Sequence, residues 1–496
     1  MGTLNFLLPP DLPASVHAEL ERASIAGGQE HMPYHTQATL QNGQLSLART
    51  VQESGHVLSP WDVPGYGRLL LPSATLMERP APYHLAKELA RGTINHVRCQ
   101  TAEWIQSGLA MRPNLDDYIR EATHAFGKTL ISQDADETTR LAQEALVLGC
   151  RAAEELVATY ARQVFQIRHQ RLPRLETLLG CRLTGVPRSA EMQRAVADTF
   201  NAAVVHVPWN VIEPSEGNLH WQPFDDVIDF VQGNGQTVLA GPLIDFSGYG
   251  LPDWLWAKEL DLTLRCDYMS EFIDRIVLRY KGRVKHWQLT AGSNLAGVVA
   301  RSEDELLWLT LRLIETARQT NADAEYSVGL AQPFGDYLAV HEQTNSPLAF
   351  ADALLRTGVK LTALELEFIM GLDPRGSYCR HSLDFSRIID LYSYLGIPLL
   401  LTVGYPSDSQ TDPIADKEPR ATAGYWHSGF SSECQAEWVD QFVSLGLAKP
   451  MVRGVMWSDF DDGLPHQFPH VGLVDAQGNP RPALQRMLDL RREHLK

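Results

Sequence analysis

Short apolar runs alternate with amphipathic stretches over roughly the last 300 residues of the chain. The segment Val204 to Trp254 shows the pattern: an apolar run, a loop with Pro214 and Gly217, helix-spaced apolar positions, and a second apolar run. The helix-spaced positions are Phe224, Val227, Ile228 and Val231. Strand, loop, helix and strand in this order make a βαβ unit, so the pattern predicts a parallel sheet.

The same alternation predicts eight strands with helices between them. A (β/α)8 TIM barrel fits this number and length, with a doubly wound open sheet as the alternative. The predicted strands are Arg182–Val186, Ala202–Val207, Thr237–Ile244, Val284–Thr290, Glu325–Leu330, Leu361–Ile369, Pro398–Val403 and Val452–Trp457. We expect the barrel to occupy residues 179–496.

Residues 1–82 show a different pattern, with short apolar runs and turn signals. The runs predict a small all-β, sandwich-like module, and Asn42-Gly43 between two of them predicts a hairpin. Such a module could bind carbohydrate or could serve only as a packing domain. The predicted strands are Leu4–Leu8, Ala38–Leu40, Leu45–Ala48, Val57–Leu58 and Arg68–Leu71.

Residues 83–178 are expected to form a helical linker subdomain. Asp134 and Glu137 have the spacing of a capping box at the start of a long helix. An earlier helix is expected over His84 to Leu109. The subdomain would brace the β-module on the barrel, or its apolar stripe would mediate oligomerisation. The stripe consists of Leu141, Ala145, Leu148, Ala152, Leu156 and Val164.

Charge and cysteine usage narrow the classes of function. The 496 residues carry a net charge of −17, which argues against a nucleic-acid partner. Six cysteines are scattered without a CxxC pair, so we expect free buried thiols in a reducing compartment.

The N-terminal residues show no secretory signal or membrane span, which predicts a cytoplasmic protein. No nucleotide-binding motif appears, and we expect no cofactor; the oligomeric state stays open.

The order of several motifs resembles glycoside hydrolase family 10, the xylanase family. The motifs that carry the resemblance are Trp209, Glu213-Pro214, Gly217, Phe224-Asp225, Asn234-Gly235, and Leu251-Pro252 with Trp254. The similarity extends over roughly residues 180–490. It implies a barrel that acts on or binds a β-linked oligosaccharide or polysaccharide at the C-terminal mouth.

Two positions depart from that family. Gly292 stands where the resemblance places the general acid/base glutamate, and Val403 stands where it places the nucleophile. Neither residue can transfer a proton or attack a sugar. The sequence therefore predicts that the family's retaining, double-glutamate reaction is absent. Two alternatives remain: an enzyme with a rearranged set of carboxylates, and a non-catalytic carbohydrate-binding or structural pseudo-glycosidase.

Glu367 is the candidate for a functional carboxylate. It shares one face of a predicted strand with Glu365, with leucines on the other face. Acids inside an apolar barrel are costly unless they are paired or face a wet cavity. Glu367 is therefore either a catalytic group, acting with Asp459 after the last strand, or one half of a buried pair with an arginine.

Four further residues are expected to contact sugar at the mouth: Trp209, Asn294, Tyr405 and Trp457. Aromatic faces stack on sugar rings, although filling of the core explains large aromatic residues equally well. No metal site is expected. The aspartates from 459 to 462 do not have EF-hand spacing, and Pro469 keeps His466 and His470 off one helix face.

Overall fold

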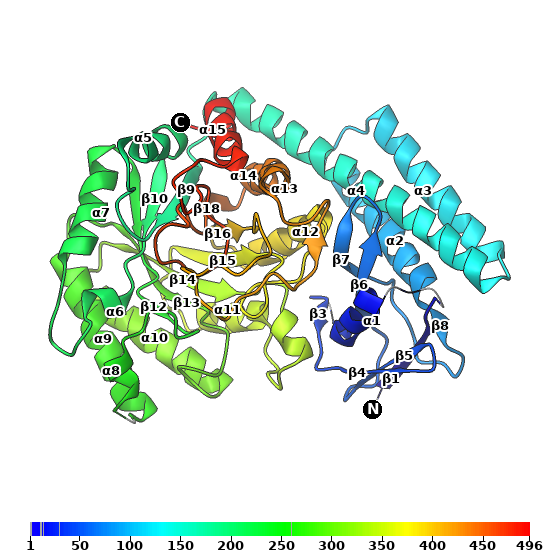
Figure 1. Cartoon of the computed structure of the whole chain (residues 1–496), viewed down its shortest axis with the longest axis horizontal. Helices are drawn as coiled ribbons and strands as arrows, with labels where there is room; N and C mark the ends of the chain where they lie inside the picture. Colours follow the sequence, from blue (N-terminus) through cyan, green and yellow to red (C-terminus); the bar gives the residue numbers. More distant parts are fainter. Residues whose placement is uncertain (1, 10–11, 13, 29, 259) are drawn as a thin grey trace.

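The computed structural model describes residues 2–9, 12, 14–28, 30–258 and 260–496. The chain passes from an N-terminal β region through three helices into a closed parallel barrel (Figure 1). The expectation about a secretory signal concerns the first residues of the chain, of which 1, 10, 11 and 13 lie outside the described residues.

Eight parallel strands form the barrel, as the alternation of apolar runs predicted. The sheet closes because β11 pairs with both β10 and β13, which excludes the open-sheet alternative. The strands are β9 (Leu178–Leu183), β10 (Ala202–Val205), β11 (Thr237–Ala240), β13 (His286–Ala291), β14 (Glu325–Ala331), β15 (Ala363–Ile369), β16 (Leu399–Gly404) and β18 (Val452–Trp457). The third strand was predicted too long: it ends at Ala240, and β12 (Ile244–Asp245) follows as a separate short strand.

Helices lie around this sheet and begin at residues that suit helix N-termini. Ser189, Asp261, Ser302, Ser346 and Ser431 each accept a hydrogen bond from a backbone N–H of the first helical turn. The helices are α5 (Ala190–Thr199), α6 (Trp209–Ile212), α7 (Gln222–Gly233), α8 (Asp253–Trp256), α9 (Leu262–Arg279), α10 (Glu303–Thr320), α11 (Pro347–Arg356), α12 (Ser382–Ser393), α13 (Ser432–Trp438), η3 (Val439–Val443), α14 (Ser444–Ala448) and α15 (Pro482–His494). The four helix-spaced apolar residues of α7 are all buried, as predicted.

Two layers of side chains occupy the barrel interior. The lower layer, toward the N-terminal ends of the strands, is an apolar cluster of Ala202, Val204, Leu239, Ala363, Leu400 and Met456. The layer above it is polar, because the inward positions two residues further along several strands carry charged or hydrogen-bonding groups. An apolar floor therefore supports the polar groups at the C-terminal ends of the strands, where barrel enzymes place their sites.

The N-terminal strands form two sheets. The first has the order β4 (Gln37–Gln41), β5 (Gln44–Arg49), β1 (Gly2–Leu7), β8 (Tyr83–His84). The second has the order β17 (Tyr425–Trp426), β7 (Gly67–Pro72), β6 (His56–Val63), β2 (Ser24–Gly27), β3 (Met32–Pro33). The predicted hairpin at Asn42-Gly43 joins β4 to β5.

Both sheets extend beyond the predicted module of residues 1–82. β8 lies just past that limit, and β17 comes from a loop of the barrel and pairs with β7. Backbone hydrogen bonds therefore connect the N-terminal β region directly to the barrel.

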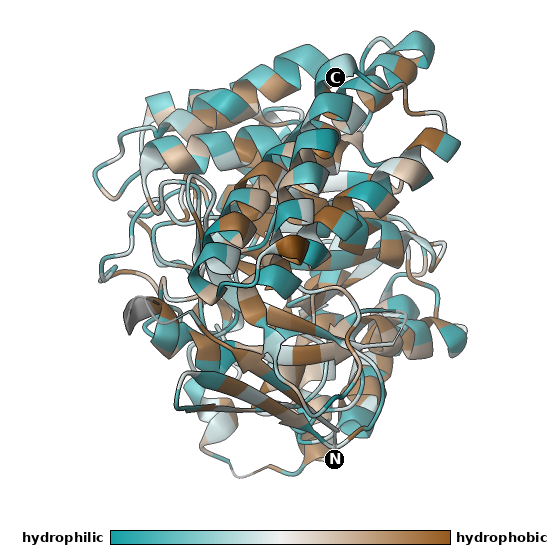
Figure 2. Ribbon diagram, turned by 90° about the vertical axis from the view of Figure 1, so that its right-hand side faces the viewer, coloured by the Kyte–Doolittle hydropathy of each residue, from teal (hydrophilic) through white to brown (hydrophobic). Residues whose placement is uncertain are grey.

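Three helices follow the β region: α2 (Leu85–Gln106), α3 (Pro113–Ile131) and α4 (Ala135–Arg171). The capping box is confirmed, since the Asp134 carboxylate accepts a hydrogen bond of 2.7 Å from the Glu137 backbone N–H. Hydrophobic and hydrophilic residues alternate along the helices (Figure 2), and the buried stripe of α4 packs against α2 and α3. Burial of this apolar stripe stabilises the packing of the three helices.

Cysteine burial follows the prediction except at one position. Cys150, Cys181, Cys266, Cys379 and Cys434 are buried free thiols, whereas Cys99 is exposed. Among the described residues, no helix combines the length and apolar character that spanning a bilayer requires.

Candidate active site

Arg182 is the central cation of the polar layer. It sits in β9, is 3% exposed, and points into the barrel because the residues on either side of it face the outer core. Its Nη2 lies 3.8 Å from Oε2 of Glu367, and its Nη1 donates a hydrogen bond of 3.2 Å to the side chain of Gln467. The Gln467 amide donates in turn to Oδ2 of Asp245 at 3.2 Å. The Arg182 guanidinium on the first barrel strand is thus connected to the sixth barrel strand, to β12 and to the loop that carries Gln467.

Glu365 and Glu367 both face the interior, as the strand alternation predicted. Glu365 is deeper: it accepts a hydrogen bond from the Thr402 hydroxyl and lines a small internal cavity of about 20 Å³. The Glu367 side chain keeps 15% of its surface exposed. Burial raises the pKa of Glu367 to about 8; the Arg182 charge opposes this, and neighbouring carboxylates reinforce it. Burial raises the pKa of Glu365 as well.

Asp459 approaches the same guanidinium from the loop after β18. The backbone N–H of Phe460 donates to the Arg182 carbonyl at 3.2 Å, which holds this loop beside β9. Oδ2 of Asp459 is buried and accepts no hydrogen bond from any residue that the structure describes. Burial raises the pKa of Asp459 to about 6, against the opposing charges of Arg182 and His466.

These shifts give two carboxyl groups different protonation states at neutral pH. Glu367, with its pKa at about 8, holds its proton and can donate it, whereas Asp459, with its pKa at about 6, is largely ionised. Environments that separate the pKa values of two nearby acids are a feature of acid–base sites. Arg182 is also the kind of partner that the alternative for Glu367, a buried pair with an arginine, requires.

The structure adds Arg182, Asp245 and Gln467, which the sequence interpretation missed. Arg182 could have been found by the criterion applied to Glu367, because it is a charged residue within an apolar strand. Asp245 directly follows a predicted strand, where a barrel places functional side chains. A Cβ on Gly292 would lie 3.9 Å from Oδ1 of Asp245, so a carboxylate stands beside the position that lacks the expected glutamate. Gln467 lies in a long loop and had no sequence signal.

Val403 does not face the interior. In the register between β15 and β16, Glu367 pairs with Thr402 and Phe368 pairs with Val403, so Thr402 points inward and Val403 outward. The position chosen by comparison with family 10 is therefore not the one that a nucleophile would need. The inward positions of this strand are Leu400, Thr402 and Gly404, and none of them has a carboxylate.

Tyr405 and Trp457 lie in the core with their polar atoms already bonded. The Tyr405 hydroxyl donates to the Gly429 carbonyl at 3.1 Å and accepts from the backbone N–H of Trp426 at 2.9 Å. The Trp457 indole N–H donates to the Val471 carbonyl at 2.7 Å. A sugar that used these atoms would first have to displace backbone groups.

Asn294 and Trp209 also make internal contacts. The Asn294 amide donates to the Ala331 carbonyl at 3.0 Å and accepts from the Ala331 N–H at 2.9 Å, which fixes the end of β14. Trp209 stacks on Phe272 of α9 with ring centroids 4.5 Å apart, and its N–H donates to Glu213 at 2.8 Å. The structure thus brings Glu367 and Asp459 together around Arg182 and gives the four predicted sugar contacts other partners.

A second charged cluster, Asp412, Asp462 and His466, lies beside Asp459. Ligand-type atoms of these three residues lie within 4.8 Å of one another. His466 Nε2 lies 3.1 Å from Asp412 Oδ2, and Arg481 Nη1 lies 2.7 Å from Asp462 Oδ2. Although burial lowers the pKa of His466, the hydrogen bond with Asp412 raises it to about 9. These contacts join the groups as ion pairs, which hold the loops together at the mouth.

Residues 182–290 match the sequence model of glycosyl hydrolase family 10. Endo-1,4-beta-xylanase B of Thermotoga neapolitana is 21% identical over 300 residues, which cover 58% of this chain and 79% of that protein. Endo-1,4-beta-xylanase A of Xylanibacter ruminicola is 29% identical over 101 residues, or 19% and 27% of the two chains. Xylanase 10B from Thermotoga petrophila, solved with xylobiose, is 16% identical with a TM-score of 0.47, covering 67% of this chain and 97% of that one.

The fold and the polar mouth define a TIM-barrel protein with charged groups at the C-terminal ends of its strands. Its barrel is similar to that of glycosyl hydrolase family 10, as the order of motifs suggested.

Proposed function

We propose that this protein holds a β-linked glycan at the C-terminal mouth of its barrel and does not carry out the double-glutamate retaining reaction. The family match over residues 182–290 supports the ligand class. The absence of carboxylates at Gly292 and at the inward positions of β16 supports the second part. Its chemistry would therefore differ from that of the xylanases to which it is similar, although its barrel is of the same kind.

In the first candidate function the glycan is a substrate. The observation that carries this candidate is the pair Glu367 and Asp459 around Arg182. Glu367, protonated at neutral pH, is suited to donate a proton to a glycosidic oxygen, and the ionised Asp459 is suited to stabilise positive charge on the sugar ring. Glu367 is the more exposed member of the group and is the one that a ligand at the mouth would reach first. The proposed catalytic groups are therefore those chosen from the sequence, with Arg182 as the residue that positions them.

A second candidate, a non-catalytic binding or structural protein, is favoured by the burial of the same group. Arg182, Asp245 and Asp459 are almost completely removed from solvent. A sugar could reach them only if the loops after β18 moved. In this alternative the charges stabilise the barrel, and any glycan binds above them.

The two candidates are separated by hydrolysis and binding measured on the same preparations. We expect negligible turnover of xylan and aryl xylosides, since loss of a general acid alone costs about 10²–10⁴ in rate. Other aryl β-glycosides and a glycan array test the wider proposal, with Glu367→Gln, Asp459→Asn and the exposed control Glu433→Gln. Activity or glycan binding that both mouth variants weaken and the control retains supports the first candidate.

Xylanase-like turnover in the wild type would contradict the proposal. Binding and activity that are indifferent to both mouth substitutions would exclude the carboxylates and favour the structural candidate.

A further inference from the structure

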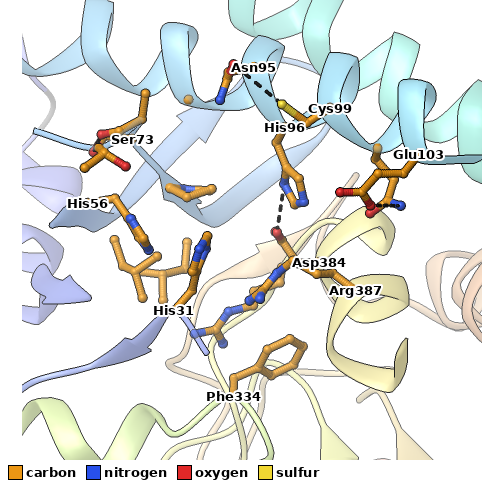
Figure 3. A pocket seen from close by; sticks show the side chains of 18 residues that line it. His31, His56, Ser73, Asn95, His96, Cys99, Glu103, Phe334, Asp384 and Arg387 are labelled. Carbon is orange, nitrogen blue, oxygen red and sulfur yellow. Dashed lines mark hydrogen bonds and ion pairs between the residues drawn. The ribbon is translucent and has the colours of Figure 1, made fainter. Parts of the chain in front are cut away.

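A cavity lies away from the barrel mouth, where the N-terminal β region, α2 and α12 meet (Figure 3). Its volume is about 280 Å³, room for about nine water molecules at about 30 Å³ each. It shares no lining residue with the group around Arg182. Its polar lining includes His31, His56, His96, Asp384 and Arg387.

Arg387 is the cation of this cavity and is incompletely paired. Among the described residues, its guanidinium makes one hydrogen bond, a long one of 3.4 Å from Nη1 to the Glu30 carbonyl, and no carboxylate lies within 4.0 Å of it. Burial lowers the pKa of Arg387, the nearby Arg380 charge lowers it further, and the Asp384 carboxylate opposes both. A guanidinium has five N–H donors in a fork that fits an oxyanion, and the described residues use one of those of Arg387, which lines the cavity.

Three histidines surround the same space. The rings of His31 and His56 lie with centroids 4.3 Å apart, and His96 Nδ1 lies 3.4 Å from Oδ1 of Asp384 (Figure 3). His56 is 6% exposed, and the Nε2 atoms of His56 and His96 have no hydrogen-bond partner within the described part of the chain. Buried polar atoms without partners cost free energy, so these nitrogens are available to a ligand.

The ring arrangement argues against a metal ion as the occupant. In the described residues the only group with converging metal-ligand atoms is the one at the barrel mouth, so His31, His56 and His96 do not converge on one point. Asp384 is already engaged by His96. Asp384, Glu103 and Arg380 also line the cavity, and the groups that the described residues leave available are most of the Arg387 fork and Nε2 of His56 and His96.

We propose that this cavity binds the oxyanion group, phosphate or carboxylate, of a small molecule. The fork of Arg387 takes two of its oxygens, and the imidazole N–H groups of His56 and His96 donate to the same anion. Phe334, which lines the cavity, offers an apolar surface to the remainder of the ligand. Because β6, α2 and α12 all contribute, the ligand would bind across the junction between the β region and the barrel.

The test uses the full-length chain and two probes, sodium phosphate and sodium glucuronate, against sodium chloride at equal ionic strength. Calorimetric titration and thermal melts compare the wild type, Arg387→Gln and the control Arg356→Gln, whose side chain is 79% exposed on α11. We expect one of the probes to bind and raise the Tm of the wild type and the control. Arg387→Gln should weaken that binding by about tenfold to a hundredfold, the cost of a charged hydrogen bond.

Phosphate binding alone would assign a phosphorylated ligand, and glucuronate binding alone would assign a carboxylate. Failure of both probes to bind the wild type, or equal binding by Arg387→Gln, would overturn the proposal. If Arg387→Gln does not fold, ethoxycarbonylation of wild-type histidines by diethyl pyrocarbonate replaces it. The bound probe should then protect His31 but not the exposed His220, and equal labelling with and without the probe would count against the site.

Discussion

The guanidinium of Arg182 and the carboxyl group of Glu367 lie 3.8 Å apart inside the barrel, although they come from strands that are not neighbours. β9 and β15 are separated in the sheet by β18 and β16, so the two side chains meet across the interior. The separation is too long for a direct hydrogen bond. Burial raises the pKa of Glu367 despite this adjacent cation, and the neighbouring carboxylates that share the guanidinium reinforce the rise.

The first prediction concerns the pH dependence of stability in Glu367→Gln. The pKa of Glu367 is raised from its ordinary value of 4.5 to about 8, so its contribution to stability is full below pH 4.5 and is lost as pH rises through 8. The loss is on the order of 1.4 kcal/mol per pH unit within this window. Glutamine, which resembles the protonated acid, should remove it.

Urea denaturation of wild type and Glu367→Gln at several pH values between 4.5 and 8.5 provides the measurement. The stability of the variant relative to wild type should increase as pH rises, with Glu433→Gln parallel to wild type throughout. Parallel curves for wild type and Glu367→Gln would show that the Glu367 proton is not bound more tightly in the folded state.

A second prediction is that Arg182→Met destabilises the protein by about 3–5 kcal/mol, because it leaves buried carboxylates without their cation. Combining it with Asp459→Asn should recover part of the loss, since the ionised member of the group is then replaced by a neutral side chain. Arg194→Met, at a side chain that is 74% exposed, should change stability by no more than about 0.5 kcal/mol. A cost for Arg182→Met as small as that of the control would mean that the charge is dispensable to the fold.

The third prediction concerns His466. Its pKa is raised from 6.5 to about 9, so the stability it contributes is present below pH 6.5 and is lost as pH rises through 9. His466→Asn should therefore cost most at pH 6, on the order of 3 kcal/mol, and least at pH 9.5. Chemical denaturation at the two pH values checks this, with the exposed His220→Asn as control. A cost that is equal at both pH values would exclude the protonated pair with Asp412.

The fourth prediction separates two roles for Asn294. Its amide satisfies both the N–H and the C=O of Ala331, so Asn294→Ala should cost about 1–3 kcal/mol for each of these backbone groups left without a partner. Asn218→Ala, on the exposed surface, is the matched control. A melting temperature that Asn294→Ala leaves unchanged, together with weaker glycan binding, would instead make this residue a ligand contact.

The barrel was predictable because strand and helix periods alternate in an unbroken order from Leu178 to Trp457. Each predicted strand has a counterpart, and the errors are at the ends, as at Ala240, where local sequence is a weak guide. The β17–β7 pairing could not be predicted, since β17 is a two-residue strand whose partner lies far away in the sequence. No periodic signal exists in so short an element.

The candidate site was predictable where a charged residue interrupts an apolar strand. Glu367 was identified by that criterion, and its partner Arg182 met the same criterion. The presence of Gln467 and Asp245 at the site depends on the path of the chain after the strands. The periodicity of the sequence does not predict that path. The four predicted sugar contacts rested on residue type and position after a strand, and neither property distinguishes a side chain at the surface of a cavity from one packed beneath it.

The pairing of β7 with β17 has a consequence for synthesis of the chain on the ribosome. One edge of β7 is completed by Tyr425 and Trp426 and by the Cys379 carbonyl, which accepts from the Leu70 N–H at 2.9 Å. These partners emerge roughly 300–350 residues after β7, or about 15–70 s later at translation rates of about 5–20 residues per second. During that interval the nascent chain presents an unpaired strand edge, the kind of surface that recruits chaperones and other nascent chains.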